Sequence, residues 1–185
     1  RTLIDTYFRT NTYPYTRHHI ESYDHFLSTD LINIMKSNNP VLILKDNIEG
    51  TNLYRYKAEL YIGGESGTEI QIGSPTISLQ HTADVRLLFP NEARLRNLTY
   101  AAAVTATIYV KLFYTESATA RPVPLEVPPF QNVPLFKMPI MLHSSYCILH
   151  DKPKEFLREA GECPYDNGGY FIVDGAEKVL VTKQE

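Results

Sequence analysis

The chain has 185 residues, of which 43% are hydrophobic, and its formal net charge is −3. This length suits one domain, or one domain and a part, and the apolar content is sufficient for a buried core. The small negative charge argues against a free-standing DNA-binding protein, because such proteins carry a basic face. No apolar run approaches the ~20 residues that cross a bilayer, and no signal-peptide pattern is present, so we expect no membrane partner.

The cysteines and histidines do not show the spacing of a metal site. Cys147 and Cys163 lie far apart without a CxxC pair, which predicts two reduced thiols and neither a zinc site nor a disulfide. His18, His19 and His25 fall on a predicted helix, where adjacent residues project in different directions, so we interpret them as part of a solvated face. We therefore expect no metal and no cofactor in this chain.

The first 40 residues are predicted to be helical. Apolar residues at helical spacing indicate a short amphipathic helix over residues 1–9 and a longer helix over about residues 16–37. Asn38, Asn39 and Pro40 end the longer helix, because proline disfavours helical geometry in the residue before it.

The pattern then changes to the alternation of strands. Residues 53–62 alternate apolar and polar side chains, and Gly63, Gly64 and Gly67 predict a hairpin turn to a return strand that begins at Ile70. This glycine-rich stretch lacks the Gly-Lys-Ser/Thr ending of a phosphate-binding loop. Residues 102–114 form the longest predicted strand.

Prolines dominate residues 121–140, which contain six of the 12 in the chain. This density excludes a helix and a central strand, and it predicts an extended connector or edge segment whose apolar side chains lie against the sheet. A PxxP ligand is the alternative interpretation.

Residues 89–100 predict a short helix that carries two arginines in opposed directions. Pro90 suits the first turn of this helix, and Arg94 and Arg96 follow. One interpretation is that an arginine braces the sheet through a bidentate pair with Glu92 or Asp84. The other is that an arginine contacts a nucleic-acid phosphate or a partner subunit, and the sequence does not choose between the two.

Potential nucleophiles cluster in residues 138–149, around His143, Ser144 and Cys147. A hydrolase would need an oriented base and an oxyanion site, and no glycine elbow or third orienting motif accompanies these residues. We therefore predict no catalytic residue here. A short helix is expected after Asp151 and through Ala160.

The stretch over residues 161–185 predicts a hairpin. Gly168 and Gly169 permit a tight bend or a close backbone approach, and Asp174 with Gly175 suits the positive φ angles of a type I′ turn. The strands are expected at residues 170–173 and from residue 177 onwards.

Three segments together resemble a known family. ECPYDNGGYFIVDGAEKVL, FPNEARLRNLTY and MPIMLHSSYCIL are similar to motifs of the second-largest, β-like subunit of multisubunit DNA-directed RNA polymerases of the eukaryotic, archaeal and large-DNA-virus type. HHIESYDHF resembles the helix that opens the same subunit. That subunit is much longer, so we expect this chain to be its beginning.

The resemblance implies an α+β fold in which amino-terminal helices pack on a mostly antiparallel sheet. It implies a helical section over residues 1–40 and a protrusion domain over residues 41–185, together one structural unit that stops before the lobe. The protrusion forms one wall of the DNA cleft. The positions that we expect near nucleic acid are Lys178, Lys183, Gln184, Arg94 and Arg96. His143 stands where the family usually has a basic residue.

The resemblance also implies the chemistry and the partners. Nucleotidyl transfer by two metal ions needs clustered carboxylates, which in the family belong to the largest subunit, so we expect Mg²⁺ there and no catalytic residue in this chain. The implied partners are the largest and smaller subunits, the DNA template, the RNA–DNA hybrid and general transcription factors. The expected setting is intracellular: a nucleus, an archaeal cytoplasm, or a viral factory or virion. The alternative is a stand-alone, polymerase-like interaction module that binds transcription factors.

Overall fold

The computed structural model describes residues 1–11, 13–48, 54–78, 85–116 and 121–181, which form helices and a mostly antiparallel sheet. The predicted α+β fold is confirmed. The chain divides into two compact units: unit 1 comprises Arg1–Ser28, Ile72–Ala103 and Lys137–Glu185, and unit 2 comprises Thr29–Gln71 and Val104–Phe136. The predicted sections over residues 1–40 and 41–185 stay a prediction.

The amino-terminal helices follow the predicted boundaries. They are α1 (Thr2–Thr10), α2 (Arg17–His25), the π-helical η1 (Phe26–Asp30) and α3 (Leu31–Asn38). The last three follow one another without a gap, so the helix predicted over residues 16–37 is confirmed, with a π-helical segment inside it. Asn39 is extended, with φ −81° and ψ 143°, and it ends α3 as expected before a proline.

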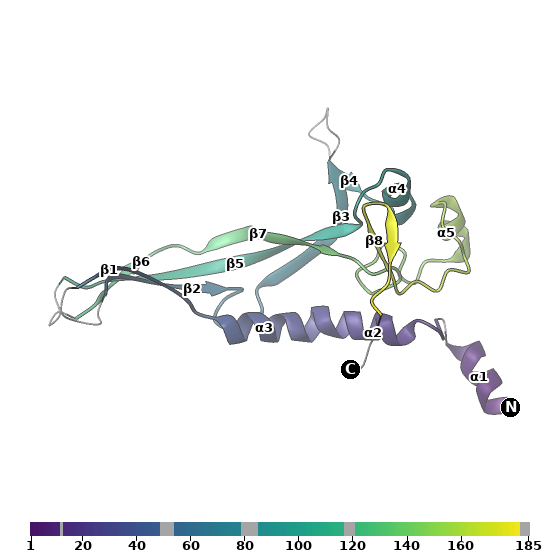
Figure 1. Cartoon of the computed structure of the whole chain (residues 1–185), viewed down its shortest axis with the longest axis horizontal. Coiled ribbons are helices and arrows are strands. Elements are labelled where there is room, and N and C mark those ends of the chain that lie inside the picture. Colours follow the sequence, from purple (N-terminus) through teal and green to yellow (C-terminus); the bar gives the residue numbers. More distant parts are fainter. Residues whose placement is uncertain (12, 49–53, 79–84, 117–120, 182–185) are drawn as a thin grey trace. The chain divides into compact units, whose positions relative to one another are not determined.

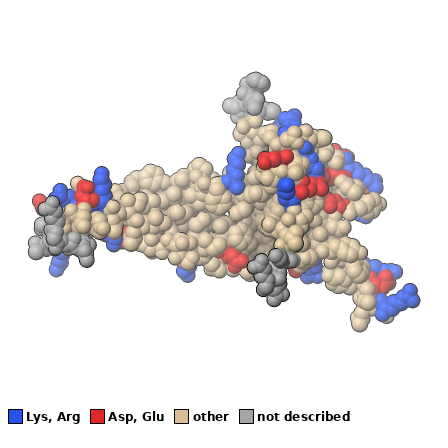
Figure 2. All heavy atoms as spheres, viewed as in Figure 1, with Lys and Arg blue, Asp and Glu red and all other residues tan. Residues whose placement is uncertain are grey.

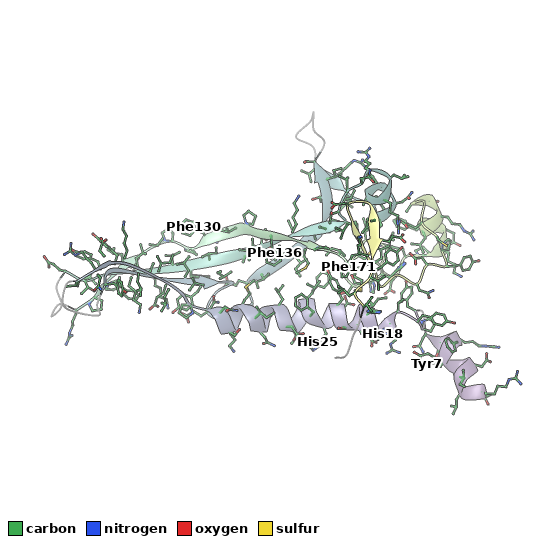
Figure 3. All side chains as sticks on the ribbon, in the orientation of Figure 1. Tyr7, His18, His25, Phe130, Phe136 and Phe171 are labelled. Carbon is green, nitrogen blue, oxygen red and sulfur yellow. The ribbon has the colours of Figure 1, made fainter. Side chains whose placement is uncertain are left out.

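The histidine pair on α2 differs from its prediction. The rings of His18 and His19 lie 4.1 Å apart, centroid to centroid, so the expectation that they project in different directions is wrong. Figure 3 shows His18 and His25 at separate points along α2. Among the described residues, no group of three His, Cys, Asp or Glu side chains is placed to hold a metal ion.

The central strand of the sheet is β5 (Ala101–Tyr114), which confirms the longest predicted strand. The strand order is β1 (Val41–Asn47), β2 (Tyr54–Ile62), β5, β3 (Ile70–Ser78) and β4 (Val85–Leu87), while β6 (Val123–Glu126) and β7 (Phe130–Pro139) also pair with β5. The β1–β2, β2–β5, β3–β4 and β5–β6 pairs are antiparallel.

The predicted hairpin at the glycine-rich turn is wrong. β2 pairs with β1 and β5, and β3 pairs with β4 and β5, so the two strands do not pair with each other. Around the turn, the Gly63 N–H donates to the Thr107 carbonyl, and the Thr107 N–H donates to the Glu69 carbonyl. After the turn, the chain therefore continues along the same edge of β5. Local glycine content predicts a turn but does not say which strand lies beside it.

The proline-rich segment forms two strands that pair with β5, in agreement with the predicted edge position. Its apolar side chains are more exposed than predicted. Val123, Leu125 and Phe130 are each at least 50% exposed, and Phe136 is 40% exposed. Figure 3 marks Phe130 and Phe136 along β7.

Unit 1 contains the main core. α4 (Pro90–Leu95), α5 (Lys154–Glu159) and the hairpin of β8 (Phe171–Val173) and β9 (Ala176–Lys178) belong to it, and β8 lies beside α4 (Figure 1). Fully buried members of the core include Tyr100, Ile140, Leu142 and Ile172. No helix in the described part of the chain has the length and apolar character of a membrane span.

Candidate nucleic-acid interface

The two candidate arginines lie at the end of α4. Pro90 occupies the first turn, where its missing N–H costs no helical hydrogen bond, and Ala93 is fully buried and anchors the helix to the core. Asn97 has a φ of 51°, a left-handed conformation that asparagine tolerates, and so the helix ends. The chain thereby returns to the core at Tyr100, close after both arginines.

Arg94 binds side chains from three other segments of unit 1. Its Nη1 donates to both carboxylate oxygens of Glu162, at 3.2 and 2.9 Å, and its Nε donates to Glu177 at 2.9 Å. Its Nη2 donates to the Tyr170 hydroxyl at 2.7 Å, which in turn donates to Asp166 at 2.6 Å. We call these five residues the Arg94 network.

The electrostatics of the network keep Arg94 charged. Partial burial opposes the charge of Arg94, but the contact with Glu162 outweighs it and raises the pKa of the guanidinium. Burial, followed by the hydrogen bond to Asp166, raises the pKa of Tyr170. Tyr170 is therefore a neutral hydroxyl that accepts from Arg94 and donates to Asp166. Because Arg94 is already bound by protein groups, its geometry is that of a bracing residue.

The loop before β8 approaches two other segments closely. Gly168 has a φ of 63°, and a Cβ there would lie 2.5 Å from Cδ2 of His143 and 2.6 Å from the Leu142 carbonyl oxygen. Gly169 has a φ of 79°, and a Cβ there would lie 2.8 Å from Cβ of Thr16. The Thr16 hydroxyl also donates to the Asn167 carbonyl at 2.5 Å. Both glycines thus stand where a side chain would displace a neighbour.

The β8–β9 hairpin is confirmed, and its turn rests on the end of α4. Asp174 and Gly175 have φ angles of 51° and 76°, as a type I′ turn requires. The Gly175 N–H donates to the Leu98 carbonyl at 3.0 Å, and the Thr99 hydroxyl donates to Asp174 at 3.1 Å. The second strand is shorter than predicted, since β9 ends at Lys178.

The remaining candidate cations differ in their surroundings. Lys178 is exposed on β9, opposite Phe171, and its ammonium group makes no hydrogen bond or ion pair to another described residue. The Arg96 side chain is 52% exposed, and its Nε lies 3.1 Å from Glu92. Arg86 also binds Glu92, so two arginines share one carboxylate. Figure 2 shows positive and negative side chains gathered over α4 and β8. Lys183, Gln184 and Asp84 lie outside the described residues.

His143, Ser144 and Cys147, the residues considered for a hydrolase, each contact a different partner. His143 is buried, and its Nδ1 lies 3.0 Å from the Tyr13 hydroxyl. The Ser144 hydroxyl donates to the Met141 carbonyl at 2.7 Å, and Cys147 Sγ lies 3.6 Å from the Tyr100 hydroxyl. These contacts give neither nucleophile a histidine base.

The acidic side chains of the network do not fit a Mg²⁺ site. Glu162 and Glu177 each bind the guanidinium of Arg94, whose permanent positive charge repels a divalent cation. Asp166 accepts from Tyr170 in the same cluster. The carboxylates of the Arg94 network are therefore ligands of protein groups and are not placed to hold Mg²⁺.

Comparison with known protein families decides the identity. A family model described as RNA polymerase beta subunit matches residues 14–185. The chain belongs to this family. The resemblance read from the three motifs, to the amino-terminal region of the second-largest subunit, is confirmed.

Individual relatives agree with the family match. The chain is 31% identical over 168 residues to DNA-directed RNA polymerase II subunit RPB2 of Encephalitozoon cuniculi, covering 91% of this chain and 14% of that protein. It is 35% identical over 169 residues to RNA polymerase III subunit RPC2 of Saccharomyces cerevisiae, with 91% and 12% covered. It is 31% identical over 183 residues to subunit Rpo2N of Methanothermobacter thermautotrophicus, with 99% and 30% covered. The chain thus spans less than a third of each relative.

The sequence pointed to both arginines and to Glu92, which pairs with Arg96, but not to the partners of Arg94. Arg94 instead binds Glu162 and Glu177, which are 68 and 83 positions away along the chain. A signal was present, because both glutamates and Tyr170 lie in the motif that carries the family resemblance. The sequence alone does not show that these residues lie close to Arg94 in the folded chain.

Proposed function

We propose that this chain forms one wall of the DNA cleft in a multisubunit DNA-directed RNA polymerase, as the protrusion region of its second-largest subunit. The observation that carries the proposal is the family match over residues 14–185. The relatives it resembles are named as subunits of DNA-directed RNA polymerases II and III and of an archaeal polymerase. In this role the chain takes part in RNA synthesis from a DNA template.

Within this function we assign one role to the arginine that is bound by protein groups and another role to the exposed positively charged side chains. Arg94 braces the wall, because its donors are bound to Glu162, Glu177 and Tyr170. Lys178 faces the nucleic acid, since it is exposed and has no described partner to neutralise it. Arg96, which shares Glu92 with Arg86, contributes a second positive charge nearby on the same unit. We assign the same role to Lys183 and Gln184, which follow along the chain.

The chemical step belongs elsewhere in the assembly. We propose that the largest subunit supplies the carboxylates that hold Mg²⁺ for nucleotidyl transfer. The partners of this chain are then the largest and smaller subunits, the DNA template, the RNA–DNA hybrid and general transcription factors. Its setting is intracellular, in whichever compartment its polymerase transcribes.

A photo-crosslinking experiment tests the assignment of Lys178. A photoreactive phenylalanine derivative replaces Lys178 in the complete subunit, which is assembled into polymerase on a DNA template with a labelled RNA–DNA hybrid. We expect a crosslink to DNA or RNA from this position. The same probe at Glu155, an exposed residue of α5 in the same unit, serves as the control and is expected to give none. Equal crosslinking from both positions, or none from Lys178, would refute the assignment.

A further inference from the structure

The second strand of the β8–β9 hairpin has no apolar anchor. β9 consists of Ala176, Glu177 and Lys178, and all three are exposed. Residues 179–181, which follow, are apolar and exposed as well. A two-stranded ribbon of three residue pairs is by itself only marginally stable in water. The direction in which Lys178 points therefore depends on the few polar contacts of β9.

Glu177 makes the polar side-chain contact that holds β9. Its carboxylate accepts a hydrogen bond from Nε of Arg94 at 2.9 Å, and no other β9 side chain makes a hydrogen bond or an ion pair to a described residue. Arg94 is itself fixed, because its Nη1 is bound to the buried Glu162 and its helix is anchored by the buried Ala93. The ion pair thus ties β9 to a rigid point of unit 1.

The alternation of side chains along β9 links this ion pair to the direction of the lysine. Glu177 lies opposite Ile172, which is fully buried in the core, and Lys178 lies opposite Phe171. Successive side chains of a strand point to opposite faces, so the lysine shares the face of Phe171, whose ring lies 5.4 Å from that of Tyr23 (Figure 3). Releasing Glu177 would remove the side-chain contact that fixes this orientation.

The charge of Glu177 gives the opposite expectation. A carboxylate next to Lys178 in the chain would repel a phosphate that approaches the lysine. Arg94, which keeps its positive charge, pairs with this carboxylate and reduces the repulsion. As a charge alone Glu177 disfavours nucleic acid, whereas as a holder of β9 it favours the contact of Lys178. The two interpretations predict effects of opposite sign when the carboxylate is removed.

We propose that Glu177, bound to Arg94, is a positioning residue for a contact between Lys178 and a phosphate of the nucleic acid. The ion pair fixes the face of β9 from which the lysine projects, and this contribution exceeds the repulsion between the carboxylate and the phosphate. Nucleic-acid binding then depends on an acidic side chain that does not touch the nucleic acid. This inference rests on the proposed function, in which Lys178 faces the nucleic acid.

Substitutions in the complete subunit, assembled into polymerase, test the role of Glu177. Glu177→Thr keeps a residue that favours strands but is too short to reach Arg94, and it leaves the bond between Arg94 and Glu162 intact. Fluorescence anisotropy measures the affinity for a DNA template that carries a labelled RNA–DNA hybrid. We expect Glu177→Thr to weaken binding by at least about threefold at low salt, roughly 50 mM.

Two further variants serve as controls for charge and for the hydrogen bond. Glu177→Gln removes the charge but keeps an amide oxygen that accepts from Arg94, so it should weaken binding less than about twofold. Glu155→Thr removes the same charge from an exposed position of α5 and should change binding by less than about 1.5-fold. If Glu177 acted only by repulsion, both substitutions of Glu177 would strengthen binding.

A double variant separates positioning from a general effect on the fold. Lys178→Ala should remove about one phosphate contact, so that the loss of affinity between roughly 50 and 200 mM salt becomes about threefold smaller. Adding Glu177→Thr to Lys178→Ala should then change the affinity by less than about 1.5-fold, because no lysine is left to position. A purely structural role of Glu177 would weaken binding equally with and without Lys178.

The possible failures are distinguishable. Unchanged or stronger binding by Glu177→Thr, or a loss of the same size with and without Lys178, would overturn this inference and leave the assignment of Lys178 intact. Equal effects of Glu177→Thr and Glu155→Thr would do the same. An unchanged salt dependence in Lys178→Ala would refute the assignment of Lys178 to the nucleic acid, and this inference with it.

Discussion

At the scale of single residues, Arg94 has the most consequential contacts of the candidate interface. A sequence that places two arginines on a short helix beside a family motif invites a phosphate-binding role for both. The structure separates them: Arg94 is bound to two carboxylates and a tyrosine, and Arg96 is half exposed beside Glu92. A guanidinium with five donors in a planar fork can hold several segments together in this way.

Removing the guanidinium should destabilise the protein. In Arg94→Ala, Glu162, whose side chain is only 5% exposed, loses its ion-pair partner, and we expect the free energy of unfolding to fall by about 3 kcal/mol. Urea denaturation of the purified chain measures the difference. Arg158→Ala, at an exposed arginine of α5, is the matched control and should change stability by less than about 0.5 kcal/mol. A loss of the same size in both variants would show that Arg94 is not a brace.

His143 should make stability depend on pH. Burial lowers the pKa of His143 below its ordinary value of 6.5, although Asp166 opposes the shift and His150 reinforces it. As pH falls through about 6.5 towards the lowered pKa, the unfolded chain binds a proton that the folded chain does not, so stability is lost by up to ~1.4 kcal/mol per pH unit. His143→Asn, which tolerates the φ of 65°, should flatten this part of the stability curve. Parallel curves for the two proteins between pH 7 and 5 would contradict the assignment.

At the scale of elements, the end of α4 and the β8–β9 hairpin form one interlocked assembly within unit 1. The turn of the hairpin accepts and donates hydrogen bonds at Leu98 and Thr99, and the loop before β8 lies against His143 and Thr16. Because β9 presents Lys178, the position of that lysine depends on the packing of this loop.

The glycine at the closest approach provides a test of that dependence. Gly168→Ala needs a left-handed φ and places a Cβ against a backbone carbonyl, so we expect a loss of at least about 2 kcal/mol in the free energy of unfolding. Gly73→Ala, on β3, meets only an ordinary contact of 3.4 Å and should be nearly neutral by comparison. Thermal or urea denaturation of both variants gives the answer, and a tolerated alanine at position 168 would remove the packing argument.

Local patterns predicted those elements whose signals are local. The helix end before Pro40, the alternation along β5 and the Asp-Gly turn each depend on residues within a few positions of one another. The pairing of β2 and β3 with β5 was missed, because turn chemistry does not identify the neighbouring strand. The partners of Arg94 were missed for the same reason: Glu162 and Glu177 reach it only through the folded loop and hairpin.

At the scale of the whole molecule, the net charge of the chain differs from that of an independent DNA-binding protein, which carries a basic face. Its net charge is −3, and the positive side chains of α4 are largely paired with carboxylates. Affinity for DNA depends on phosphates neutralised by unpaired cations. In the role that we propose for the chain, other parts of the polymerase supply most of the positive field around the DNA.

The isolated chain should consequently bind duplex DNA weakly and make no RNA. We expect a dissociation constant in the range of non-specific binding, roughly 10⁻⁴–10⁻⁶ M at physiological salt. Fluorescence anisotropy with a labelled duplex measures it. Nanomolar binding under the same conditions would show that the chain is a DNA-binding module in its own right.

Purification of the natural protein that carries this sequence tests the central claim most directly. The protein is tagged in its own cells, isolated under native conditions and assayed for RNA synthesis on a DNA template. We predict that the largest subunit of a DNA-directed RNA polymerase is recovered with it in equal amount and that the preparation makes template-dependent RNA. Recovery of the tagged protein without a largest subunit and without RNA synthesis would contradict the claim.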